Sequence, residues 1–221
     1  LEDAKGMNCS TPLAKYVAQE EGIKLKAYGD VGGKATIGVG HLITENEIKQ
    51  GFIDTGNGDK IMINRENILD TVGTKEQIKD LFEKRDLPEH EARAKKSLGD
   101  DAWKKLKDEQ KASIISYVYN VGNADGLVER GLRDAILSGD TDKAAKIVAN
   151  GVNTVDGVPH KGLVNRRKRE GELFKNGFAD DTKVPATKAP AAKTPTMQDP
   201  TTATGRPKNT NVGRSASKTV S

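Results

Sequence analysis

The stretch of sequence that decides the fold is residues 21–41, EGIKLKAYGDVGGKATIGVGH. Its first part alternates apolar residues with lysines, which is typical of a half-buried strand: Ile23, Leu25 and Ala27. Three glycines then punctuate a turn: Gly29, Gly32 and Gly33. Thr36–Val39 has the pattern of a second strand, so the stretch predicts a β-hairpin.

A helix is predicted immediately before the hairpin, over residues 11–21. Apolar residues recur there at helical spacing from Leu13 onward. Either Ser10 or Thr11 can serve as the N-cap, and Gly22 marks the end of the helix.

The segment after the hairpin is less regular. A short helix is expected near residues 45–50, and residues 51–73 are rich in Gly and Asn, with one short strand at Ile61–Ile63. From Thr74 onward the pattern is helical, because Thr74 and Gln77 have the spacing of a capping box ahead of apolar residues.

The rest of the chain up to residue 175 predicts helices with short connections, over residues 101–121, 127–137, 141–149 and 163–175. The first of these ranges is expected to be the most buried, with Trp103 in the core. Helices that follow a hairpin predict an α+β fold with a small N-terminal β-hairpin lobe and a larger C-terminal helical lobe.

Composition divides the chain into a globular domain at residues 9–178 and a flexible tail at residues 179–221, rich in Pro, Thr and Lys. Residues 182–221 hold seven Lys or Arg and one Asp, a net charge of +6, whereas the whole chain carries +4. Residues 1–181 therefore carry −2, and the high isoelectric point belongs to the tail. A basic nucleic-acid-binding globule is not indicated.

Cys9 is the only cysteine, so an internal disulfide is excluded. No run of 18 apolar residues predicts a membrane span, and residues 1–20 lack the apolar stretch of a signal peptide. The chain starts at Leu1 rather than Met, which is compatible with a processed piece of a longer protein.

Polar groups gather where the first helix meets the hairpin. Glu21 closes the helix, Asp30 lies in the hairpin turn, and Thr36 begins the returning strand. Helix end, turn and strand start would form one side of a cleft mouth, where a few polar groups can converge. Breaking a glycosidic bond needs such a pair, one acid for the leaving oxygen and one carboxylate for a water or a direct attack.

These residues resemble the signature of phage lysozymes of glycoside hydrolase family 24: Glu, eight residues, Asp, five residues, Thr, then Ile-Gly-x-Gly-His. Every spacing fits, from Glu21 to His41. Two later blocks are similar too, Glu109–Gly122 and Gly162–Phe174, so the resemblance covers roughly residues 11–178.

The resemblance implies hydrolysis of the β-1,4 bond between N-acetylmuramic acid and N-acetylglucosamine in peptidoglycan, with inversion and with no cofactor or metal. It makes Glu21 the general acid and lets Asp30 and Thr36 hold the attacking water. Four further residues are implied to support the site or the sugar: His41 at the end of the hairpin, Arg166 paired with the acid, and Tyr119 and Asn120 along the cleft.

Some features depart from the family or stay open. A tryptophan is expected near residues 150–160, where this chain has Asn153–Asp156. Of the basic run 166–169, the three residues other than Arg166 are expected on a solvated face. An arginine beside Glu21 would favour the charged carboxylate, whereas a general acid needs its proton, and the sequence leaves this conflict open.

Three functions are compatible with the sequence. The first is an endolysin that waits in the host cytoplasm and is released to the periplasm and cell wall. The second is a lysozyme carried in the virion tail, where the tail segment could contact other phage proteins. The third is a non-catalytic wall-binding or structural module, which the presence of both Glu21 and Asp30 disfavours. Glycan strands of peptidoglycan are the expected partner, with no nucleic acid.

Overall fold

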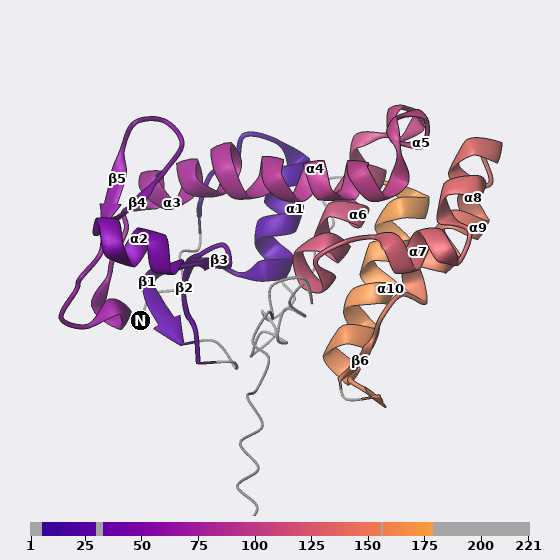
Figure 1. The fold of residues 1–221 in the computed structure, drawn as a ribbon. Coiled ribbons are helices and arrows are strands. Elements are labelled where there is room, and N and C mark those ends of the chain that lie inside the picture. Colours follow the sequence, from indigo (N-terminus) through magenta and orange to yellow (C-terminus); the bar gives the residue numbers. More distant parts are fainter. Residues whose placement is uncertain (1–5, 30–32, 156, 179–221) are drawn as a thin grey trace, which may run out of the picture.

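The computed structural model describes residues 6–29, 33–155 and 157–178. The predicted tail and Asp30 lie outside these described residues. A small part that holds the first five strands lies beside a larger helical part, and one long helical run crosses from one to the other (Figure 1). The prediction of an α+β fold with two unequal lobes is confirmed.

The first helix, α1, spans Pro12–Glu21, as the sequence predicts. Thr11 is the N-cap, and its hydroxyl accepts from the Ala14 N–H. Pro12 suits the first turn because its missing N–H has no helical partner there. Gly22, with φ of 73°, ends the helix and turns the chain into the first strand.

The predicted hairpin is present and gains a third strand. β1 (Lys24–Gly29) pairs antiparallel with β2 (Ala35–Gly38), which pairs with β3 (His41–Leu42). Gly38, the last residue of β2, has a φ of 68°. A β-carbon at this position would lie 3.3 Å from the Ile78 side chain. The positive φ therefore favours glycine at this bend, and a β-carbon would in addition press on the Ile78 side chain.

The region that the sequence left irregular forms a second, two-stranded sheet. β4 (Phe52–Asp54) pairs with β5 (Lys60–Met62), which overlaps the predicted strand at 61–63. The short helices α2 (Glu45–Gln50) and η1 (Ile68–Asp70) flank this sheet in the sequence. After η1, residues 71–73 hydrogen-bond along the free edge of β1.

The long helical run consists of α3 (Lys75–Leu81), the π-helical turn η2 (Phe82–Asp86) and α4 (Leu87–Leu98). Thr74 and Gln77 form the predicted capping box. Pro88, in the first turn of α4, cannot donate to a carbonyl of the preceding turn. The wide turn of η2, in which the Leu87 N–H reaches the Phe82 carbonyl, accommodates this proline within the run.

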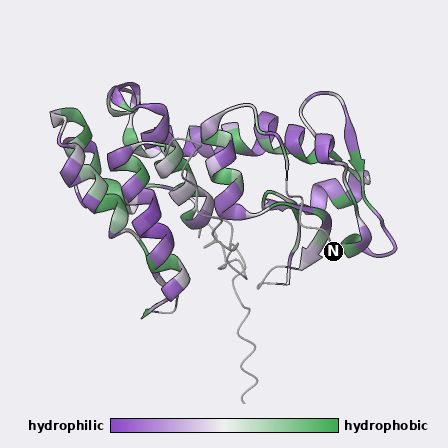
Figure 2. Ribbon diagram, turned by 180° about the vertical axis from the view of Figure 1, so that it is seen from behind, coloured by the Kyte–Doolittle hydropathy of each residue, from purple (hydrophilic) through white to green (hydrophobic). Residues whose placement is uncertain are grey.

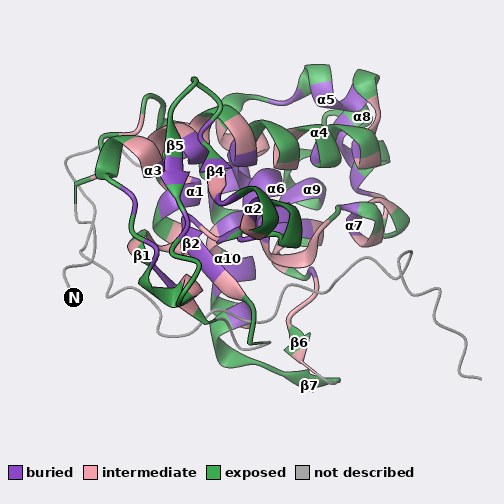
Figure 3. Cartoon of the chain, turned by 60° about the vertical axis from the view of Figure 1, so that its left-hand side comes forward, coloured by how far each residue is buried: buried purple, intermediate pink, exposed green. Residues whose placement is uncertain are grey.

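The helical part is built around α6 (Asp108–Val121), whose residues 112–119 are all buried (Figure 3). Helices α1, α4 and α10 (Lys161–Asn176) pack against it. The helical part also contains α5 (Asp100–Lys105), α7 (Asp125–Glu129), α8 (Leu132–Ser138) and α9 (Thr141–Ala149). A hairpin of β6 (Thr154–Val155) and β7 (Val158–Pro159) joins α9 to α10. This hairpin occupies the segment in which a tryptophan was expected.

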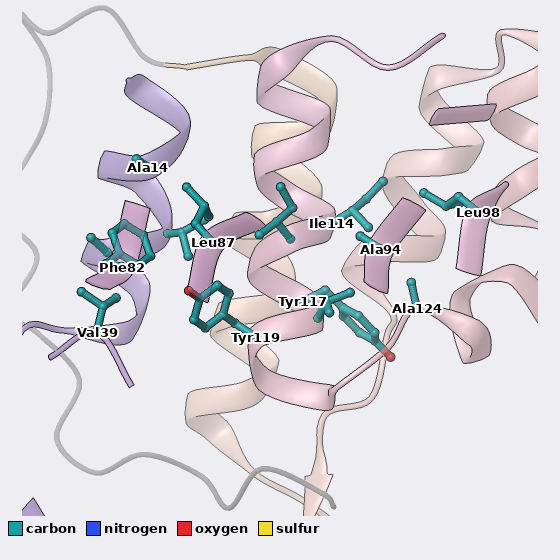
Figure 4. Close-up of a cluster of buried hydrophobic side chains, with 14 of the residues drawn as sticks. Ala14, Val39, Phe82, Leu87, Ala94, Leu98, Ile114, Tyr117, Tyr119 and Ala124 are labelled. Atoms are coloured by element: carbon teal, nitrogen blue, oxygen red, sulfur yellow. The ribbon is translucent and has the colours of Figure 1, made fainter. Parts of the chain in front are cut away.

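The hydrophobic core is continuous between the two parts. Figure 4 shows side chains of α6 between Phe82 and Leu87 on one side and Ala94, Leu98 and Ala124 on the other. Seen from behind, the helices alternate hydrophobic and hydrophilic faces (Figure 2). Trp103 is buried, as predicted. Within the described ranges, no helix is long and apolar enough to cross a bilayer.

Candidate active site

Glu21 lies at the last position of α1, and its side chain is only 8% exposed. Its Oε1 accepts a hydrogen bond of 2.5 Å from Nη2 of Arg166, on α10. A buried carboxylate is costly unless it is paired, and the guanidinium supplies the partner. The structure therefore places together Glu21 and Arg166, two of the residues that the sequence singled out.

Arg166 is itself held from several sides. Its Nη2 donates to the Ser116 carbonyl at 2.7 Å and to the Ser116 hydroxyl at 3.1 Å, and its Nε donates to Glu170 at 3.0 Å. Burial alone would lower the pKa of Arg166, but the charges of Glu21 and Glu170 outweigh it and raise the pKa. The guanidinium thus stays charged and its plane is fixed.

Arg167 and Glu170 lie beside this pair with no exposed side-chain surface. Arg167 Nε is 3.0 Å from Oε2 of Glu170, an ion pair whose angle is too bent for a good hydrogen bond, and Arg167 Nη2 donates to Oε1 at 3.2 Å. The guanidinium also lies over the Tyr117 ring, 4.5 Å from its centre. The expectation that Arg167 is solvated is wrong, because it belongs to the inward face of α10.

Glu20, next to Glu21, makes a second bridge between the same two helices. Arg169 donates to both of its carboxylate oxygens at 2.7 Å. The Arg169 side chain is partly exposed and Lys168 is exposed, so the solvated face predicted for the basic run is reduced to these two residues.

Thr36 is the second residue of β2, buried and paired in the ladder with Tyr28 and Leu42. Asp30 lies outside the described residues. The complete trio of Glu21, Asp30 and Thr36 therefore remains an expectation from the sequence.

His41 begins β3 and is buried between two carboxylates. Its Nδ1 is 2.9 Å from Asp86, and its Nε2 is 3.2 Å from both oxygens of Glu47. Burial alone would lower the pKa of His41, but the hydrogen bonds to Asp86 and Glu47 outweigh it and raise the pKa to about 9. With both ring nitrogens facing carboxylates, the imidazolium ties β3 to α2 and to η2.

Tyr119 and Asn120 lie near the end of α6, and their expected place along the saccharide cleft stays a prediction. The Tyr119 ring is buried and stacks on His90, with ring centres 3.7 Å apart and planes at 14°. Asn120 is partly buried, and its Oδ1 accepts from Arg167 Nη2 at 3.1 Å. Asn120 is thereby joined to the Arg166–Glu170 group.

A model of the phage lysozyme family matches residues 18–170 of the chain. The chain belongs to the phage lysozyme family. The matched range includes both partners of the Glu21–Arg166 contact and all of the buried group behind it.

The chain is 30% identical over 145 residues to the pre-baseplate central spike protein Gp5 of Enterobacteria phage T4, an alignment that covers 63% of this chain. The chain spans about a quarter of the length of this curated relative, since the alignment covers 24% of Gp5.

Two solved structures have the same fold. An endolysin from the Escherichia coli phage FAHEc1 aligns with a TM-score of 0.56 and 20% identity, covering 81% of this chain and 100% of the endolysin. A mutant of P22 lysozyme aligns with a TM-score of 0.53 and 25% identity, covering 76% of this chain and 99% of that lysozyme.

Glu170 and Ser116 both contact Arg166, although the sequence did not single them out. The signal for Glu170 lies in helical spacing. Position 170 is seven residues after Leu163 and four before Phe174, on the apolar stripe of α10. A charged residue on an apolar stripe, with arginines three and four positions earlier, indicates a buried ion pair.

Proposed function

We propose that the chain is a muramidase that hydrolyses the β-1,4 bond between N-acetylmuramic acid and N-acetylglucosamine in peptidoglycan. The observation that carries the proposal is the buried carboxylate of Glu21, held at 2.5 Å by Arg166 inside the range matched by the phage lysozyme family. A carboxylate at the end of a helix, fixed by a buried guanidinium, is preorganised for one reaction geometry.

In this proposal Glu21 donates its proton to the leaving glycosidic oxygen. Asp30 and Thr36 hold the water that attacks the anomeric carbon from the opposite face, so the configuration inverts. Arg166 keeps the Glu21 carboxylate in one orientation. The roles of Asp30 and Thr36 rest on their spacing in the sequence.

Product analysis tests this function directly. The purified full chain is incubated with purified peptidoglycan, and the soluble fragments are identified by mass spectrometry. We expect fragments that end in reducing N-acetylmuramic acid. Anhydro ends would indicate a transglycosylase, and no fragments at all would favour the non-catalytic wall-binding module.

A matched pair of variants assigns the acid. Glu21→Gln keeps the shape of the side chain and removes the donated proton, so we expect activity to fall by about 10²–10⁴-fold, the usual contribution of general acid–base catalysis. Glu20→Gln changes the neighbouring carboxylate, which pairs with Arg169, and should retain most activity. Equal losses in both variants would remove Glu21 from its proposed role.

The stereochemical outcome is tested by NMR spectroscopy at early reaction times. Inversion of a β-linked substrate yields the α-anomer first, before mutarotation mixes the two forms. An initial β-anomer would show retention, which would require a different role for Asp30.

We propose further that the enzyme is carried in the virion. The similarity to part of Gp5, a central spike protein, supports this site of action over an endolysin released from the host cytoplasm. Mass spectrometry of purified phage particles decides between them. Peptides of this chain in washed particles are expected, and their absence would favour the endolysin.

For residues 179–221 we propose a linker to another virion module rather than an electrostatic tether, because the positive charges are spread along the segment. Cutting after residue 181 should leave binding to purified cell walls unchanged at low salt. A loss of binding at low salt that vanishes near about 0.5 M salt would instead show a tether, since attraction between exposed charges is screened there.

A further inference from the structure

Glu21 and the three charged side chains behind it form one buried group of four: Glu21, Arg166, Arg167 and Glu170. Two guanidinium groups face two carboxylates, so the group is neutral only when all four are charged. Arginine keeps its proton at any ordinary pH. The charge of the group therefore changes only through its carboxylates.

Glu170 is the centre of this group. Its Oε1 accepts from Arg166 Nε at 3.0 Å, from Arg167 Nη2 at 3.2 Å and from the Ser116 hydroxyl at 2.7 Å. Arg166 turns its Nε edge to Glu170 while its Nη2 reaches Glu21. Because a guanidinium is planar, fixing one edge fixes the direction of the other.

The second effect of Glu170 is on charge. Complete burial raises the pKa of Glu170 above its ordinary value, although the two guanidinium groups and the Ser116 hydroxyl favour the charged form. Without the Glu170 carboxylate, Glu21 would face two buried positive charges in place of one net charge. Such a surplus favours an ionised carboxylate, which is the wrong form for a general acid.

We propose that Glu170 is a positioning residue that acts on Glu21 through Arg166: it orients the Arg166 guanidinium and offsets the charge of Arg167. The inference rests on the proposed role of Glu21 as the acid. It reduces the conflict noted from the sequence, in which an arginine beside the acid would keep it ionised, because Glu21 then faces one net positive charge in place of two.

Other charged or titratable groups face Glu21 from the elements around it. On α1 and α10, Glu20 and Arg169 form their own pair. On α6, Tyr119 has a pKa that is raised well above its ordinary value, mainly by burial and also by the charges of Asp86 and Glu21. Asp30 lies outside the described residues. None of these groups is altered in the variants below, so a difference between variants reports on the Arg167–Glu170 pair.

The test compares pH–activity profiles of the full chain on soluble peptidoglycan fragments. In Glu170→Gln the alkaline limb, where the acid loses its proton, should move to lower pH by about half a unit or more. In Arg167→Met, which removes one positive charge, the same limb should move to higher pH. Glu172→Gln alters an exposed carboxylate of the same helix and should leave the limb in place.

Opposite shifts in the two variants support the proposal, whereas a uniform loss of activity with an unmoved limb would overturn it and leave Glu170 a structural residue. Should Glu170→Gln fail to fold, an unmoved limb in Arg167→Met would overturn the proposal equally. A titration of the Glu21 carboxyl by ¹³C NMR, assigned by comparison with Glu21→Gln, needs no substrate. It separates failure of this inference from failure of the proposed muramidase activity.

Discussion

Arg166 donates a hydrogen bond of 2.5 Å to Glu21, a residue 145 positions earlier in the chain. Arg169, one turn further along α10, holds both oxygens of Glu20. Two adjacent carboxylates at the end of α1 are thus bound by two arginines on one face of α10. The proposed acid is therefore fixed only once the last described helix has packed against the first.

This relationship makes Arg166 important for stability. In Arg166→Met, Glu21 loses its ion pair with Arg166 and Glu170 loses one of its two arginine partners, so we expect the free energy of unfolding to fall by about 3–5 kcal/mol. Urea denaturation measures the change. Lys168→Met, an exposed neighbour on the same helix, is the control and should alter stability by less than about 0.5 kcal/mol. Similar losses in the two variants would mean that the Glu21–Arg166 contact stabilises little.

His41 makes the free energy of unfolding depend on pH in the alkaline range. Its pKa is raised from 6.5 to about 9 in the folded protein, so its contribution is fully present below pH 6.5 and is lost as the pH rises through 9. That shift corresponds to about 3 kcal/mol. We expect the free energy of unfolding to fall by roughly this amount between pH 6.5 and 9, and His41→Asn to lack this fall.

Glu47, which contacts His41, determines how the free energy of unfolding changes at acidic pH. Burial alone would raise the pKa of Glu47, but hydrogen bonds from His41 and Thr44 outweigh it and lower the pKa from 4.5 to about 2. Its contribution is present above pH 4.5 and is lost as the pH falls through 2. Chemical denaturation across this pH range checks both limbs. A wild-type profile that matches His41→Asn at all pH values would contradict the charged network.

Local patterns account for much of what the sequence predicted. The helix at α1 follows from the Thr11 cap, the apolar spacing and Gly22, and the β1–β2 hairpin follows from alternation around a glycine-rich turn. The capping box of Thr74 is likewise read from residues three apart. Each signal lies within one short continuous stretch of sequence, which is why it is visible without a structure.

What the sequence missed depends on packing between distant segments. Residues 71–73 join the edge of β1, although they carry no strand pattern of their own. Arg167 is buried because Glu170 and the Tyr117 ring receive it, and the basic run around it gives the appearance of a solvated surface. The proposed roles of Glu21 and Arg166 came from family spacing, since physical reasoning on isolated residues cannot pair positions on two helices so far apart.

The close approach of α9 and α10 depends on Gly171. A β-carbon at this position would lie 2.6 Å from the Ala149 side chain and 2.9 Å from the Ala145 carbonyl. Gly171→Ala should therefore destabilise the protein by about 1–3 kcal/mol through overpacking, despite the better helix propensity of alanine. The control is Gly126→Ala in α7, where a β-carbon meets nothing within 4 Å; thermal denaturation should show equal or higher stability. Equal stability of Gly171→Ala would show that the two helices separate easily.

Tyr119 carries a buried hydroxyl that has no hydrogen-bond partner among the described residues. Removing an unsatisfied buried hydroxyl relieves its desolvation penalty, so Tyr119→Phe should raise the free energy of unfolding by about 1 kcal/mol. Tyr117→Phe is the matched control, because the Tyr117 hydroxyl accepts from the Val152 N–H at 3.4 Å and its loss should be neutral or slightly destabilising.

The family resemblance places Tyr119 along the saccharide cleft, whereas the ring is buried against His90. We therefore expect KM for soluble peptidoglycan fragments to be unchanged in Tyr119→Phe. A raised KM with lowered stability would show that the hydroxyl is satisfied in solution and contacts the sugar.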